Sequence, residues 1–161
     1  MPWPATCRVR CDPRQGPYDL VDFVVAEADA EQADGVLSKA GLRVEHPPED
    51  WLFKVYTDDA MVDILFRIGG VPVESPLLER ASEVEVLSIR MPVLAATDVL
   101  SAKLAAMDEH ACDLASIIAV ARAVREQVEW ERLRTEVADN DFAAAALFLL
   151  DPLGITGATE G

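Results

Sequence analysis

Basic side chains are scarce in this 161-residue chain. Lysine and arginine number 14 against 29 aspartates and glutamates, which gives a formal net charge of −15 at pH 7. Such an acidic chain is repelled by the phosphates of nucleic acid and by anionic membranes. We therefore expect no DNA partner, and an RNA would need a local basic patch. The charge favours a small-molecule or metal-bound substrate, or a basic protein partner.

Long apolar runs are absent too. No stretch reaches about 18 apolar residues, so no transmembrane helix is expected, and the N-terminus, MPWPATCR, lacks the apolar core of a signal peptide. The three cysteines are Cys7, Cys11 and Cys112. Their odd number and low density favour free thiols in a reducing compartment. Cys7 and Cys11 are spaced too widely for a CxxC pair, and a zinc site would need two further ligands that are not nearby. These features predict a cytoplasmic protein without a membrane partner.

The hydrophobic pattern predicts an α+β domain with a small mixed sheet and a helical C-terminal half. We expect an irregular segment at 1–17, a sheet part at about 18–95, a helical part at about 97–155 and a tail at 156–161. The predicted strands are 20–26, 42–44, 51–56, 61–66 and one or two segments in 84–93. The predicted helices are 27–39 ending at Gly41, 75–81 capped by Ser75, 98–127 capped by Thr97 and Asp98 and interrupted near 109–112, 130–138, and 141–150.

Two of these strands carry an aspartate between apolar and aromatic neighbours: Asp22 in YDLVDFVV and Asp63 in MVDILF. Burying a carboxylate in such surroundings is costly unless something compensates it. On neighbouring strands the two could hold Mg²⁺ (or Mn²⁺) against the phosphates of a nucleotide. The alternative is that each aspartate caps a strand end or pairs with an arginine such as Arg67.

Several segments occur in the order found in bacterial nucleotidyltransferase-fold proteins. They are VDFVV (21–25), WLFK (51–54), VDILFR (62–67), MPVLAATDVLSAKL (91–104), DEHACD (108–113) and the helix at Trp130. Over residues 18–155 the chain resembles the group that includes the AbiEii-type toxins of type IV toxin–antitoxin systems. The resemblance implies the nucleotidyltransferase fold and a magnesium-dependent nucleotide site.

By this resemblance, Asp22 is the second metal-binding aspartate of a pair one residue apart. Asp63 is the third carboxylate, with a further role as the base toward an attacking hydroxyl. The first position falls on Leu20, which cannot bind a metal. Asp19 lies one residue earlier and would point to the opposite face of a regular strand unless a bulge turned it.

The resemblance also assigns Lys103 and Asp113 to catalysis and nucleotide binding, since a lysine can reach a triphosphate as a point charge. Two structural alternatives stay open. Lys103 could extend to solvent along an apolar helix face, and Asp113 could cap a second helix. His110 is more typical of a surface or capping residue.

The implied activity is Mg²⁺-dependent transfer of a nucleotide monophosphate from a nucleoside triphosphate to an RNA, protein or small-molecule acceptor. A toxin-like role would bring an antitoxin-like protein partner. The family's Gly-Ser turn, which helps hold the triphosphate, is absent from residues 1–17. Two alternatives follow: a catalytically degenerate copy that binds a nucleotide or a protein, or a true start upstream of Met1.

The apolar segment 143–150 predicts a buried helix or a partner surface.

Overall fold

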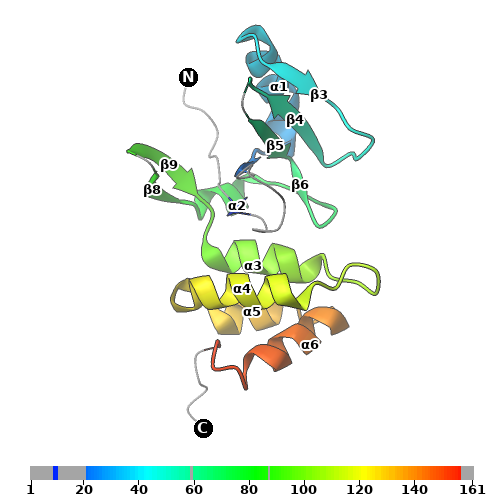
Figure 1. Cartoon of the computed structure of the whole chain (residues 1–161), viewed down its shortest axis with the longest axis vertical. Helices are drawn as coiled ribbons and strands as arrows, with labels where there is room; N and C mark the ends of the chain where they lie inside the picture. The colour runs from blue at the N-terminus through cyan, green and yellow to red at the C-terminus, as the bar shows by residue number, and fades with distance from the viewer. Residues whose placement is uncertain (1–8, 11–20, 59, 87, 157–161) are drawn as a thin grey trace. The chain divides into compact units, whose positions relative to one another are not determined.

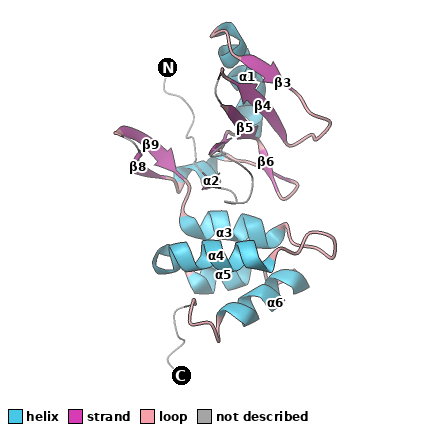
Figure 2. Cartoon of the chain, viewed as in Figure 1, coloured by secondary structure: helices cyan, strands magenta, loops and turns pink. Residues whose placement is uncertain are grey.

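The computed structural model describes residues 9–10, 21–58, 60–86 and 88–156. The chain divides into two compact units, Met1–Leu94 and Ala95–Gly161. The strands belong to the first unit, whereas the second is helical (Figures 1 and 2). The α+β class predicted from the sequence is thus confirmed, and the division falls beside the boundary expected at 95–97. No helix in the described part of the chain is long and apolar enough to cross a membrane.

Five strands in the described part of the first unit form one mixed sheet in the order β1-β2-β5-β4-β3. Strands β2 and β5 run parallel, and the other neighbours run antiparallel. The strands are β1 (Val9–Arg10), β2 (Val21–Val24), β3 (Arg43–Glu45), β4 (Leu52–Tyr56) and β5 (Met61–Leu65). The predicted β4–β5 hairpin is confirmed. The sequence predicted an irregular segment where β1 lies, and the other residues expected in that segment fall outside the described ranges, as does the tail after 156.

Helix α1 (Ala30–Lys39) packs against one face of this sheet, after the 3₁₀ turn η1 (Glu27–Asp29). Strand side chains alternate between faces, so every second strand residue joins this core. The buried members are Val25, Ala33, Phe53, Val55 and Ile64. The helix ends at Gly41 as predicted, because Gly41 adopts a φ of +86°. Gly41 N then donates to Ser38 O at 3.1 Å and Leu42 N to Leu37 O at 3.2 Å, the Schellman pattern.

Two small hairpins and a short helix complete the first unit. Strands β6 (Arg67–Ile68) and β7 (Val71–Pro72) meet at Gly69 and Gly70, whose positive φ values suit a tight hairpin turn. The sequence predicted only a break there. The N-cap position of helix α2 (Ser75–Glu79) is Glu74 and not the predicted Ser75, and Glu74 makes no side-chain capping hydrogen bond. Strands β8 (Ser82–Val86) and β9 (Ile89–Val93) form the second hairpin.

The helical unit contains α3 (Ala96–Ala105), α4 (Leu114–Val124), the 3₁₀ turn η2 (Arg125–Gln127), α5 (Trp130–Glu136) and α6 (Asp141–Leu150). Helix α3 contacts α4, α5 and α6 (Figure 1). The expected interruption of the long helical region is confirmed, since residues 106–113 separate α3 from α4. The fully buried side chains at the centre of this core are Leu100, Leu104, Ala121, Leu133, Ala143 and Leu150.

The prediction that Thr97 and Asp98 cap their own helix is wrong. The N-cap is Ala95, and both polar residues lie in the first turn, 1% and 6% exposed. Thr97 Oγ1 instead accepts a hydrogen bond from Glu129 N at 2.9 Å, and Asp98 forms an ion pair with Arg132. The two side chains therefore connect α3 to the start of α5. A Thr-Asp pair at the start of a helix looks the same in sequence whether it caps that helix or binds a neighbouring one.

Candidate carboxylate site on the sheet

The register of the two parallel strands places Asp22 of β2 directly opposite Asp63 of β5. Opposite residues on neighbouring strands point to the same face, and the strands lie about 4.8 Å apart. This face is the one opposite α1, because the adjacent residues Phe23 and Ile64 belong to the core beneath α1. Asp22 is half-buried, and the Asp63 side chain is 18% exposed. The sheet thus brings together the two aspartates singled out in the sequence.

A lysine that the sequence analysis did not assign to the site completes this row. Lys54 of β4 lies opposite Asp63 on its other side, and Lys54 Nζ donates to Asp63 Oδ1 at 2.8 Å. The structural alternative for Asp63 was a pair with an arginine such as Arg67, but Arg67 binds Glu27, with Nη2 2.7 Å from Oε1. The Lys54–Asp63 contact could have been predicted from the turn at 57–60, because a hairpin that closes there sets positions 54 and 63 opposite each other.

The donor set suits a hard divalent cation. Magnesium takes oxygen ligands and is commonly held by one or two carboxylates, with substrate phosphates and water completing the shell. Asp22 and Asp63 are of this residue type and lie opposite each other on adjacent strands. Among the residues that the structure describes, no group of three or more His, Cys, Asp or Glu side chains could hold a metal ion. Leu20 and Asp19, the candidates for the remaining family position, lie outside the described ranges.

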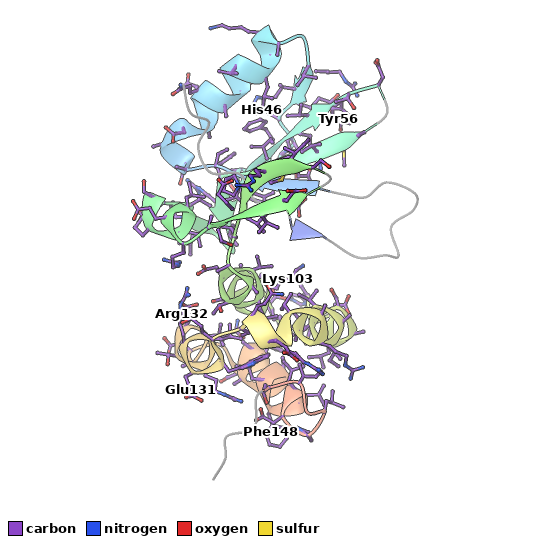
Figure 3. The ribbon with its side chains drawn as sticks, turned by 90° about the vertical axis from the view of Figure 1, so that its left-hand side faces the viewer. His46, Tyr56, Lys103, Glu131, Arg132 and Phe148 are labelled. Atoms are coloured by element: carbon purple, nitrogen blue, oxygen red, sulfur yellow. The ribbon has the colours of Figure 1, made fainter. Side chains whose placement is uncertain are left out.

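An aromatic residue with a cation above it lies on the same face, next to the carboxylate row. Tyr56 is two residues beyond Lys54 on β4, a spacing that returns to the same face about 6.8 Å farther along the strand. Arg43 of β3 pairs with Tyr56, and its Cζ lies 4.1 Å from the ring centroid. Figure 3 marks Tyr56, together with His46, whose Nε2 lies 3.0 Å from Asp34 Oδ2. None of these aromatic contacts was expected from the sequence.

The other two predicted site residues belong to the helical unit. Lys103 lies partly buried on α3. Asp113 is the N-cap of α4, with Oδ1 accepting from Ser116 N at 3.1 Å, so the capping alternative is realised. His110 is exposed in the loop between α3 and α4, where its Nε2 lies 3.2 Å from Glu109 Oε1. The four candidate catalytic residues therefore come from two units, two from each.

The chain matches no protein-family model and no curated protein. The resemblance to nucleotidyltransferase-fold proteins consequently rests on the ordered sequence motifs. The structure adds two observations that do not depend on this resemblance. Strands β2 and β5 pair in a register that sets Asp22 opposite Asp63, and Lys54, Tyr56 and Arg43 lie on the neighbouring strands.

Proposed function

We propose that this chain is a nucleotidyltransferase-like protein that binds a nucleoside triphosphate with Mg²⁺ on the Asp22–Asp63 face of the sheet. The observation that carries the proposal is the in-register pairing of these two aspartates on adjacent parallel strands. Two carboxylates side by side repel each other, so a bound cation between them would stabilise the arrangement. The order of the motifs along the chain supports a nucleotide as the ligand that accompanies the metal.

We assign a role to three of the charged groups on this face. Asp22 and Asp63 would hold Mg²⁺ or Mn²⁺, which when bound neutralises charge on the phosphate oxygens. Lys54 orients the Asp63 carboxylate through their 2.8 Å hydrogen bond and adds a donor for phosphate. Asp63 would also accept the proton of the attacking hydroxyl of an RNA, protein or small-molecule acceptor.

The Tyr56–Arg43 stack offers a planar surface for the nucleobase. Bases stack on aromatic rings and on guanidinium planes without strong sequence preference. Its position next to the carboxylate row, on the same face, suits a ligand that has phosphates at one end and a base at the other. For Lys103 and Asp113, which belong to the helical unit, a role in nucleotide binding rests on the family resemblance alone.

The Lys54–Asp63 ion pair favours a second candidate function. A carboxylate already paired with a lysine binds a metal less readily, because the lysine must first be displaced. On this alternative the fold is a catalytically degenerate copy that binds a nucleotide or a protein partner without group transfer. The two candidates differ in whether binding depends on Mg²⁺ and whether it leads to a covalent product.

The test is a calorimetric titration of the full chain with each of the four nucleoside triphosphates, once with Mg²⁺ and once with EDTA. We expect Mg²⁺-dependent binding that Asp63→Asn weakens at least about tenfold, or 1.4 kcal/mol. Comparing with EDTA is essential, because Asp63→Asn releases Lys54 to bind phosphate without the metal. The matched control is Asp58→Asn, which removes an exposed carboxylate in the turn of the same hairpin.

Transfer of a labelled nucleotide monophosphate to RNA or protein then distinguishes the two candidates. Mg²⁺-dependent binding with transfer that Asp63→Asn abolishes would support the enzyme. Binding without transfer would support the degenerate copy. If no triphosphate binds, or if Asp63→Asn and Asp58→Asn behave alike, the metal-site assignment is wrong.

A further inference from the structure

Helix α6 has an apolar outer face. After Asp141 the helix contains nine consecutive uncharged, apolar residues, up to Leu150. Its inner face is buried through Ala143, Ala146, Leu147 and Leu150, which follow the i, i+3, i+4, i+7 spacing of a core stripe. A surface helix of this kind ordinarily carries charged residues on its other side. Here that side is apolar as well.

The outer-face stripe is formed by Phe142, Ala145 and Phe148, spaced three residues apart and so adjacent on the helix surface. Phe148 is 77% exposed and Phe142 is 38% exposed. Figure 3 shows Phe148 pointing away from the other helices of its unit. Leu153, just beyond the helix, is 44% exposed. Exposed aromatic groups gathered in this way typically mark a surface that another molecule covers.

The shape of the stripe favours a helix as the covering element. Exposed Ala144 and Ala145 lie between the two phenylalanines, so the surface has large side chains at its ends and small ones at its centre. Small residues allow a second helix to approach closely, and the flanking rings can insert between its side chains. This surface lies on a rigid element that already has its own buried core face.

The charge around the stripe selects the kind of partner. Residues 95–156 contain eleven aspartates and glutamates but only five lysines and arginines. Asp139 and Asp141 precede the stripe, whereas Asp151, which follows it, is already paired with Arg134. A second copy of the chain would bring the same carboxylates and another net charge of −15 to the contact. A basic partner gains both from the apolar stripe and from the acidic surroundings.

We propose that the outer face of α6 is a docking surface for a basic amphipathic helix of another protein. The partner helix buries an apolar stripe against Phe142, Ala145 and Phe148 and places lysines or arginines beside the flanking aspartates. The proposal does not depend on nucleotide binding, since every residue that carries it lies in the helical unit.

The probe is a synthetic peptide of about 18 residues, with leucines on one helical face and lysines elsewhere. Two control peptides accompany it: one of the same composition with the leucines spread around the helix, and one with glutamates in place of the lysines. Binding of each labelled peptide to the full chain is followed by fluorescence anisotropy at physiological salt. We expect the basic amphipathic peptide to bind at least about tenfold more tightly than either control.

Substitution locates the site. Phe148→Glu should weaken binding of the basic peptide at least about tenfold, because it removes the most exposed ring of the stripe and places a charge within the apolar contact. Ile89→Glu is the matched control, since Ile89 is 60% exposed on β9 and the substitution adds the same charge. Circular dichroism establishes that both variants fold.

Three results would overturn the proposal. The first is equal binding by the native chain and Phe148→Glu, or equal losses in the two variants. The second is equal affinity for the glutamate peptide, which would remove the charge argument. The third is a native chain that sediments as a dimer which Phe148→Glu dissociates, because the occupant would then be a second copy.

Discussion

Lys54 is the residue that most alters the interpretation of the carboxylate row. Its ammonium group stabilises Asp63 beside Asp22 through a partly buried ion pair, with the two side chains 27% and 18% exposed. A divalent cation at the same place would supply the same stabilisation with greater charge. Lys54 and the proposed metal therefore act on one carboxylate, and replacing Lys54 should reveal the competition.

Lys54→Met should lower the free energy of unfolding by about 1 kcal/mol without added metal, after allowance for partial exposure. Mg²⁺ should then raise the thermal midpoint of this variant more than that of the native chain, since the metal replaces the lost cation. Thermal unfolding with and without Mg²⁺ measures both effects. Lys39→Met, an exposed lysine at the end of α1, is the control. An identical response to Mg²⁺ in all three proteins would argue against a metal on this row.

Asp151 should make the chain sensitive to acid. A hydrogen bond from Thr156, and then one from Arg134, lower the pKa of Asp151 below its ordinary value, against a smaller opposing effect of burial. Because the folded-state pKa is lowered, this stabilisation is present above the ordinary carboxyl pKa of about 4 and is lost as pH falls through the folded-state pKa.

Asp151→Asn should therefore flatten the dependence of stability on pH below about pH 4. Denaturant unfolding at a series of acidic pH values measures that slope. Asp139→Asn, an exposed carboxylate in the same unit, should leave the slope unchanged. If the stability of Asp151→Asn depends on pH as steeply as that of the native chain, other carboxylates account for the acid sensitivity.

The sequence indicated the two aspartates of the row but not their neighbours. Asp22 and Asp63 stood out because each interrupts an apolar strand, a local signal that needs no tertiary information. Lys54 and Tyr56 occupy ordinary alternating positions of a partly buried sheet face, and only strand pairing shows what they contact. Arg67 was a reasonable partner for Asp63 by proximity along the chain, yet Glu27 binds it from another element.

Among the elements, α5 is connected to α3 by the Thr97–Glu129 hydrogen bond and the Asp98–Arg132 ion pair. Arg132 of α5 forms an ion pair with Asp98, whose side chain is only 3% exposed, and also contacts Glu129 and Glu136. Removing one member of a buried pair leaves the other charge in a poor environment. The connection is therefore sensitive to the loss of Arg132.

Arg132→Leu should lower the free energy of unfolding by about 3 kcal/mol, because Asp98 stays buried with less compensation. Combining it with Asp98→Leu should restore part of that loss, since the buried carboxylate is then also removed. Denaturant unfolding of the two single variants and the double variant measures the coupling. Strictly additive effects would show that the ion pair contributes nothing.

Asp113 is an element-scale test of whether a capping residue also serves the nucleotide. Asp113→Ala should destabilise the chain by about 1 kcal/mol, because α4 loses its N-cap, whereas Asp113→Asn retains a good cap. Asp113→Asn therefore removes the charge alone. Weaker nucleotide binding by this variant, at unchanged stability, would support a binding role. Unchanged binding would leave Asp113 with the cap as its only function.

Local signals predicted most element boundaries, and they failed where one residue type has two uses. Gly41 ended α1 as expected because a left-handed φ favours glycine. Gly69 and Gly70 also adopt a positive φ, but there they close a hairpin. That hairpin was not predicted, because its two-residue strands are too short to give a strand pattern. Thr97 and Asp98 look like a cap in sequence but bind α5, since the packing of two helices is not encoded in either segment alone.

At the scale of the whole molecule, the chain has two separate hydrophobic cores. The core beneath α1 draws on residues 23–66, and the helical core draws on residues 96–155. Each unit thus buries its own apolar side chains. The sequence predicted this division because the strand pattern gives way to helical periodicity near residue 95.

Residues 95–161 alone should therefore fold into a helical unit. Their core contains thirteen buried residues, all from this segment, and the Asp98–Arg132 and Thr97–Glu129 contacts also lie within it. A domain of this size is only marginally stable, so we expect a free energy of unfolding of a few kcal/mol, on the order of 3. Cooperative denaturation of the fragment, followed by circular dichroism, measures it, and Arg132→Leu in the fragment is the internal control. A fragment that unfolds without cooperativity would show that the helical core depends on the sheet unit, and the stability effects assigned to α3 and α5 would then belong to the whole chain.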